Sequence, residues 1–225
     1  MNKLIKSGAL LLCALLFIAC NKDDEIITDP GGNTTTNLSG SIQNWPSQIL
    51  IAQAIATGTG AAVVGTDTIL ADGNLDLNLT VPPPAILRSV SDISNDTAIT
   101  ISDSTAFYAT TGSLSVFDIS NTMVGRIEKK NFDTTVVTGS FIVNYIYIDR
   151  ACNITGSSTT ASGTDTTRIE FNLSLEQGWN VFYTQQTGET PTLTTLLIAS
   201  GEPAGANWRY TASPIANRIH RMFKF

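Results

Sequence analysis

The chain has 225 residues, a formal net charge of −6 and a mean hydropathy of +0.11. This acidic balance argues against a nucleic-acid partner, because contact with a phosphate backbone requires a basic face. The length is sufficient for one large hydrophobic core or two small ones.

The first nineteen residues have the layout of a secretory signal peptide. Lys3 and Lys6 precede an apolar run from Ala9 to Ala19. The run spans about eleven residues, whereas a transmembrane helix needs roughly 20. A cleavable signal over residues 1–19 is therefore favoured over a permanent helix.

The signal ends in the four residues Phe17, Ile18, Ala19 and Cys20. They resemble a bacterial lipobox, in which an apolar residue and small residues precede a cysteine. The resemblance implies cleavage between Ala19 and Cys20 and transfer of acyl chains such as palmitate to Cys20. Two or more lipid signals give stable membrane attachment, so we expect a lipoprotein. The alternative is an ordinary secreted protein with a chance cysteine at the cleavage site.

A charged cluster follows the cysteine and consists of Lys22, Asp23, Asp24 and Glu25. It resembles the Bacteroidetes-type export signal, which implies lipid anchoring at the outer face of the outer membrane. Anionic lipid repels acidic side chains, so transport machinery would have to recognise the cluster. The alternative is that these charges only keep the linker solvated.

The segment 20–37 is rich in Gly, Thr and Asn and is expected to form a flexible tether. Removal of residues 1–19 leaves 11 basic and 19 acidic residues, a net charge of −8. It also leaves Cys152 as the only thiol that is not lipidated. No internal disulfide can then form, and packing must stabilise the folded part.

The remaining sequence predicts an all-β fold. Runs of β-branched and aromatic residues are broken by Gly, Asn or Asp at intervals of about eight to twelve residues, as in a β-sandwich. We expect an antiparallel β-sandwich architecture with two packed modules, residues 38–95 and 96–225. Strands are predicted in six windows: 46–56, 73–81, 140–148, 167–175, 180–186 and 192–200. Window 140–148 is apolar on both faces and should lie centrally.

Residues 38–81 contain a Gly40-x-Ile42 strand and an Asp72–Gly73 turn before an alternating strand. They resemble the carboxypeptidase-regulatory or transthyretin-like β-sandwich module. The resemblance implies a structural accessory without catalytic residues. Three prolines at 82–84 should end the last strand of this segment, because proline lacks a backbone donor.

Patterns for catalysis and metal binding are sparse. The single histidine, His220, is expected to be an exposed strand residue, and no motif of a metalloprotease, serine hydrolase or zinc site is present. Cys152 has no base near it in sequence, so a buried and inert thiol is expected. Polar residues alternate over 72–78, which spreads their oxygens about 6–7 Å apart on a strand. We therefore expect no catalytic residue, metal or cofactor.

Five aromatic residues could form a sugar-stacking platform, although a place in the core is favoured: Trp45, Tyr108, Tyr183, Trp208 and Tyr210. Five Asp-Ser/Thr pairs resemble the O-glycosylation motif of the same bacterial group. That resemblance implies modification at Thr68, Thr97, Ser104, Thr134 and Thr166. The alternative is that each Asp caps its own turn.

These features predict a membrane-anchored lipoprotein that acts as a non-enzymatic structural or binding module. Its partner would be a glycan or a neighbouring envelope protein. The alternative is a carboxylate-dependent hydrolase of the cell envelope or of surface glycans. Such an enzyme would require a close, partly buried pair of acids.

Overall fold

The computed structural model of the chain describes residues 36–93 and 96–213, all of which belong to one compact unit. The expected signal peptide, lipobox and acidic cluster lie outside the described residues, as does His220. The first strand begins at Thr36, so residues 36 and 37 belong to the folded body and not to the tether expected over 20–37.

The described residues lie mostly in β-strands and include no α-helix, which confirms the all-β prediction. The strands before residue 95 are β1 Thr36–Gln43, β2 Leu50–Thr57, β3 Ala61–Ile69, β4 Asn74–Leu79 and β5 Arg88–Ser89. The strands after it are β6 Ile99–Ile101, β7 Phe107–Thr111, β8 Ser113–Phe117, β9 Met123–Lys130, β10 Phe141–Ile148, β11 Cys152–Ser162, β12 Asp165–Leu175, β13 Gly178–Thr190, β14 Leu193–Ser200 and β15 Asn207–Ala212. Two short 3-10 helices, η1 Pro84–Ile86 and η2 Val90–Asp92, flank β5. Each of the six predicted windows overlaps a strand.

The strands are joined in the order β4-β1-β15-β9-β8-β2-β7-β10-β13-β14-β12-β11-β6, with β3 added to β2 and β5 to β7. Neighbours are antiparallel except β1 with β15 and β12 with β14, which are parallel. Pairing crosses residue 95, since β2 pairs with β8 and β1 pairs with β15. The boundary expected between residues 38–95 and 96–225 therefore does not separate the strand pairings.

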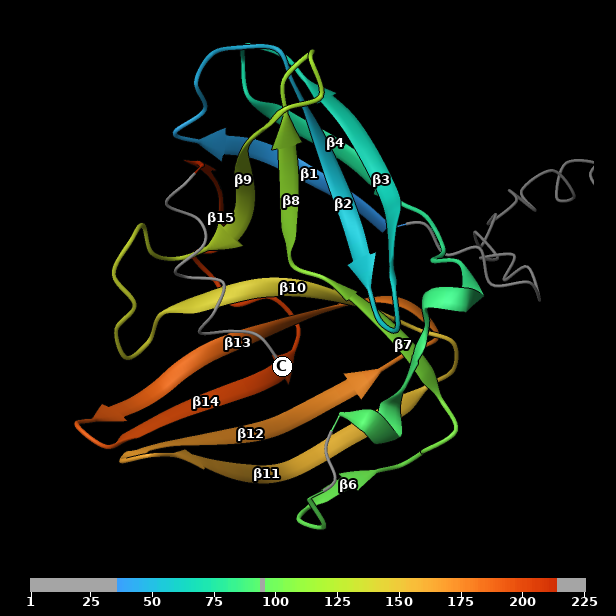
Figure 1. Ribbon diagram of the computed structural model, residues 1–225, viewed down its shortest axis with the longest axis vertical. Helices are drawn as coiled ribbons and strands as arrows, with labels where there is room; N and C mark the ends of the chain where they lie inside the picture. Colours follow the sequence, from blue (N-terminus) through green and yellow to red (C-terminus); the bar gives the residue numbers. More distant parts are fainter. Residues whose placement is uncertain (1–35, 94–95, 214–225) are drawn as a thin grey trace, which may run out of the picture. The chain divides into compact units, whose positions relative to one another are not determined.

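Seven strands form a sheet that curls back on itself, in the order β3-β2-β8-β9-β15-β1-β4 (Figure 1). Its two end strands approach each other, and Thr80 N donates to Val64 O at 2.7 Å. Gly65 permits this approach, because a Cβ atom there would lie 2.8 Å from Asn78 O and 2.5 Å from Leu77 Cδ2. We call these strands the curled sheet.

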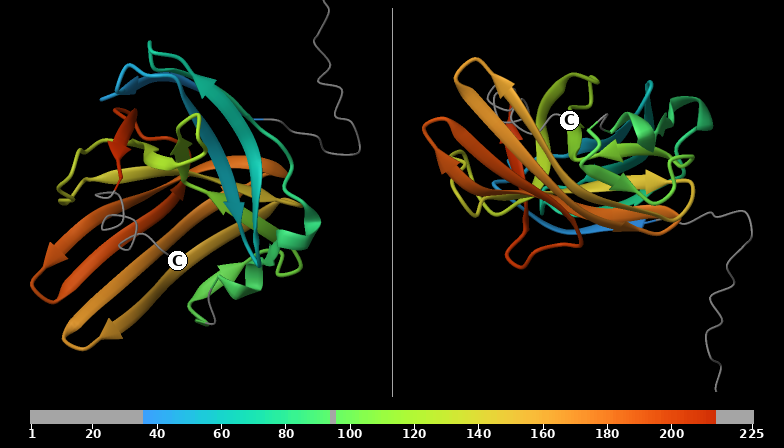
Figure 2. Two further views of the ribbon diagram at one scale, coloured as in Figure 1. Left: turned by 45° about the horizontal axis from the view of Figure 1, so that its top comes forward. Right: turned by 90° about the horizontal axis from the view of Figure 1, so that it is seen from below.

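The other strands form a second sheet in the order β7-β10-β13-β14-β12-β11-β6, in which four long strands lie side by side (Figure 2). We call it the long sheet. Residues 107–117 belong to both sheets: β7 pairs with β10, and β8 pairs with β9. Gly112 separates the two halves, and a Cβ atom there would lie 2.1 Å from Asn144 Oδ1. The chain can therefore pass from one sheet to the other at this glycine.

Two apolar cores lie on opposite faces of β10. Val143 and Tyr145 belong to core 1, together with residues of the curled sheet such as Leu77 and Ile127. Ile146 and Ile148 belong to core 2, together with residues of β11 to β14 and with Val90 of η2. Burial of one Leu or Ile side chain contributes about 1.5–3 kcal/mol, so both faces of β10 are strongly stabilised. This confirms the central position predicted for window 140–148.

Candidate functional site

The single thiol of the described residues is structural. Cys152 is buried in core 2, and its Sγ lies 3.6 Å from Asp103 O. Its burial confirms the sequence-based expectation. A nucleophile needs access and an activating group, so the packing of Cys152 gives it no place in a reactive site.

The alternating polar residues of β4 lie on its solvent face, while the leucines between them are buried. Asn37 Nδ2 on the neighbouring strand donates to Asp76 Oδ1 at 2.7 Å and to Asn78 Oδ1 at 3.1 Å. These side chains thus form a cross-strand ladder that ties β1 to β4. Within residues 36–93 and 96–213, no three His, Cys, Asp or Glu side chains gather as metal ligands do.

The aromatic residues are used mainly for packing. Trp208 is buried in core 1, stacks on Tyr145 with ring centroids 6.4 Å apart, and donates from Nε1 to Ser39 O at 3.1 Å. Tyr108, Tyr183, Trp45 and Tyr210 are half-buried and pack against the two cores. A sugar platform requires open ring faces. The interpretation of this set as core residues is confirmed for Trp208.

The expected modification sites lie on the surface. Thr68, Thr97, Ser104 and Thr134 are exposed and Thr166 is half-buried. The turn alternative is realised at two of the preceding aspartates. Asp96 Oδ1 accepts from Ala98 N at 3.0 Å, and Asp103 Oδ1 accepts from Thr105 N at 2.9 Å and from Thr105 Oγ1 at 2.6 Å. The hydrogen bonds from Thr105 hold the pKa of Asp103 below its usual value.

A buried ion pair was not anticipated from the sequence. Lys130 Nζ on β9 lies 2.7 Å from Glu128 Oε2 and 5.0 Å from the centre of the Phe132 ring. Both side chains of the pair are almost completely buried, with exposed fractions of 1% and 7%. Glu128 is the one buried carboxylate of the described residues. Since a lysine already neutralises it, we interpret the pair as structural.

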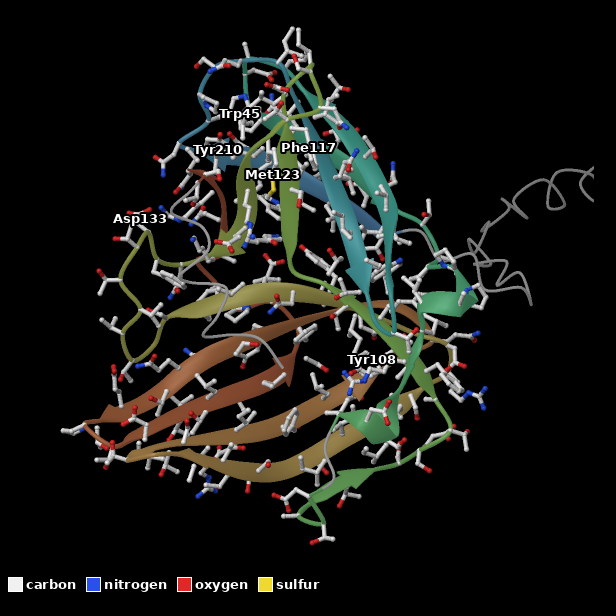
Figure 3. The ribbon with its side chains drawn as sticks, viewed as in Figure 1. Trp45, Tyr108, Phe117, Met123, Asp133 and Tyr210 are labelled. Atoms are coloured by element: carbon white, nitrogen blue, oxygen red, sulfur yellow. The ribbon has the colours of Figure 1, made fainter. Side chains whose placement is uncertain are left out.

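One end of the curled sheet carries a concentration of exposed apolar side chains. Of the eight large hydrophobic residues that are exposed in the described part of the chain, four lie at this end: Ile49, Leu70, Ile119 and Met123. We call these four residues the apolar end. Ile49 and Leu70 directly flank the paired residues Leu50 and Ile69 of β2 and β3. Met123 lies opposite Phe117 (Figure 3). Phe117 in turn lies opposite Ile51.

The loops that present the apolar end are held by specific hydrogen bonds. Asp118 Oδ1 accepts from Ser120 N and from Thr122 N, both at 2.9 Å, which fixes the turn carrying Ile119. Ile119 is 85% exposed. Trp45 Nε1 donates to Leu70 O at 2.8 Å, and the Trp45 ring meets Tyr210 edge-on at 5.4 Å. Hydrogen bonds within the chain therefore fix the backbone of these loops.

The sequence did not reveal the apolar end, because Ile119 is a single apolar residue in a polar turn and the other three adjoin the apolar residues of strands. Only the pairing of β2, β3, β8 and β9 brings them together. Exposed apolar residues that gather in this way commonly mark an interaction surface.

Comparison with protein-family models, with curated proteins and with solved structures gives no match. No helix in the described part of the chain is long and apolar enough to cross a membrane.

Proposed function

We propose that this chain is a lipid-anchored lipoprotein of the outer membrane, exposed at the cell surface, whose β body is a non-enzymatic module that binds a partner protein. The lipobox-like Phe17–Cys20 and the acidic cluster after it support the anchor and the address. The apolar end is the observation that supports protein binding.

The chemistry of the apolar end favours a protein over a glycan. Its exposed side chains are aliphatic or thioether groups, and the neighbouring Trp45 has its indole N–H engaged by Leu70 O. Glycan sites depend on open aromatic faces and on polar hydrogen-bonding groups, whereas protein interfaces have an apolar centre with a polar rim. Asp118 and Asp72 supply such a rim next to Ile119 and Leu70.

The partner is tested by photocross-linking in cells that naturally make the chain. Ile119→benzoylphenylalanine should give one discrete protein adduct, and the same replacement at Asn172, an exposed residue of β12, should not. With the identified partner purified, Ile119→Asp should weaken binding at least about tenfold, since about 1.4 kcal/mol of lost apolar contact has that effect. Equal adducts at both positions, or adducts with lipid alone, would contradict the proposal.

The anchor is tested separately. Cys20→Ser should stop acylation and release the mature chain from membranes during a carbonate wash, because the attachment relies on the acyl chains. Ser7→Ala, in the leader, is the control and should leave membrane attachment unchanged. If the Cys20→Ser chain is processed at the same bond and stays membrane-bound, the lipoprotein assignment is wrong.

A further inference from the structure

The outer edge of β11 is open over half of its length. On one side β11 pairs with β12 along its whole span, from Cys152 to Ser162. On the other side it pairs with β6 only from Ile154 to Gly156. No described residue pairs with residues 157–162 on that side, and Figure 1 shows β6 beside one end of β11 alone.

Gly156 explains where the pairing stops. Its φ is +124°, and a Cβ atom there would lie 2.1 Å from Ala98 O and 2.9 Å from Ile99 Cα. The chain before β6 therefore crosses close to β11 at this glycine and does not follow it further. Beyond that point, about every second residue of the edge presents its N–H and C=O groups outward, which gives roughly three unpaired donor–acceptor sets.

This edge has none of the usual protection against strand pairing. Natural edge strands commonly carry charges, prolines or bulges that block a second strand. Residues Cys152–Ser162 contain no charged residue and no proline. The charges of this hairpin lie on the inner strand instead, where Arg168 Nη2 and Glu170 Oε1 are 3.1 Å apart. The exposed backbone can thus accept a strand.

We propose that the open edge of β11 pairs with the same edge of a second copy of this chain, so that the long sheet continues across a twofold dimer. Twofold symmetry brings β11 antiparallel to its copy, with Thr159 or Thr160 opposite itself. Every facing residue over 157–162 is Ser, Thr or Ala, so no like charges meet although the chain as a whole is acidic. Thr and Ser pairs across antiparallel strands are favourable, and twofold dimers are the commonest assemblies.

The dimer is expected to be weak in solution. Six edge residues bury less than the roughly 800 Å² per partner that a stable interface needs. Association should therefore be reversible and visible mainly at high protein concentration. This inference does not depend on the lipid anchor, although two tethered copies would meet at a higher effective concentration.

Cysteine cross-linking tests the edge directly. The full chain, with Cys13 and Cys20 replaced by serine, retains the buried Cys152. On mild oxidation, Thr159→Cys or Thr160→Cys should give a covalent dimer. Asn172→Cys is the matched control, since it is exposed on β12 in the same sheet but away from the edge. Dimer yields at Asn172 equal to those at both edge positions would overturn the proposal.

Sedimentation of the full chain provides the second measurement. The chain with native edge residues should associate between about 10 µM and about 1 mM, and Thr160→Lys should shift this association to at least tenfold higher concentration. Circular dichroism of Thr160→Lys should match that of the unmodified chain, which separates loss of pairing from loss of fold. Self-pairing is refuted if the chain stays monomeric throughout, or if Thr160→Lys leaves its association unchanged. The edge would then be available to a strand of another protein.

Discussion

Replacing Lys130 with methionine is the most informative test of how this fold is held together. Lys130→Met keeps the length and the apolar stem of the side chain but removes its charge. Glu128 then stays buried without its ion-pair partner, since the two groups are 2.7 Å apart and almost wholly shielded from water. The contact of Lys130 Nζ with the Phe132 ring is lost as well.

The expected cost follows from this geometry. At 2.7 Å and an effective dielectric constant of about 20, the attraction of the pair is roughly 6 kcal/mol before desolvation is subtracted. Breaking a buried pair by removing one partner typically costs about 3–5 kcal/mol, because the remaining charge is uncompensated. We expect Lys130→Met to lower the free energy of unfolding by that amount. The double variant Glu128→Leu/Lys130→Met should lie within about 1 kcal/mol of the native chain, or be more stable.

Urea denaturation followed by circular dichroism measures these differences as shifts in the transition midpoint. Arg168→Met is the matched control: it breaks an ion pair of 3.1 Å whose side chains are 49% and 44% exposed, and it should cost no more than about 1 kcal/mol. If Lys130→Met costs as little as Arg168→Met, the pair is hydrated in solution and the description of a buried charge is wrong.

Three further outcomes are expected. Gly65→Ala should destabilise the chain by about 1–3 kcal/mol in thermal unfolding, because its Cβ would meet the carbonyl oxygen of β4 at 2.8 Å; no effect would mean that β3 and β4 are farther apart. Burial raises the pKa of Tyr145, so the free energy of unfolding should keep this group's contribution below pH of about 10 and lose about 1.4 kcal/mol per pH unit as the pH rises toward the folded pKa. In denaturation at alkaline pH, Tyr145→Phe should therefore lose less stability than the native chain. Equal losses would contradict this. With the other two cysteines replaced by serine, Cys152 should react with a thiol reagent only after unfolding, and fast labelling of the folded chain would show that core 2 opens.

Local alternation predicted strands such as β4 and β12 because each of these buries one face. In β4 and β12 the apolar residues occupy every second position, and those positions are the more buried ones. β10 is apolar at nearly every position, which correctly placed it between two cores. A period of two thus encodes both the strand and its buried face.

Pairing partners were harder to predict, because the sequence of one strand does not specify which strand lies beside it. The boundary between two modules was predicted between residues 95 and 96, yet β2 pairs with β8 across that point. In the same way, the charged residues of β9 were not recognised as interior positions. Glu128 and Lys130 alternate with Ile127 and Lys129 as they would on a solvent face, and only tertiary packing buries them.

The apolar end shows the same limit for the candidate site. Ile119 stands in the polar turn DISNT, and Leu70 follows the last residue of β3. A single apolar residue in a loop is ordinary, so neither position suggests an interaction surface. Their common location follows from the turn capped by Asp118 and from the pairing of β2 with β3 and β8. Neither of these can be deduced from one segment in isolation.

The parallel pairing of β1 with β15 has a consequence for how the protein is made. Ile42 lies opposite Trp208, so β1 can form this pairing only after β15, one of the last strands, has been synthesised. Contacts so distant in sequence slow folding, and until they form, β1 and β9 each lack a neighbour. A nascent chain that stalls before residue 207 would therefore remain incompletely folded, with core 1 partly exposed. It would be a substrate for chaperones and proteases.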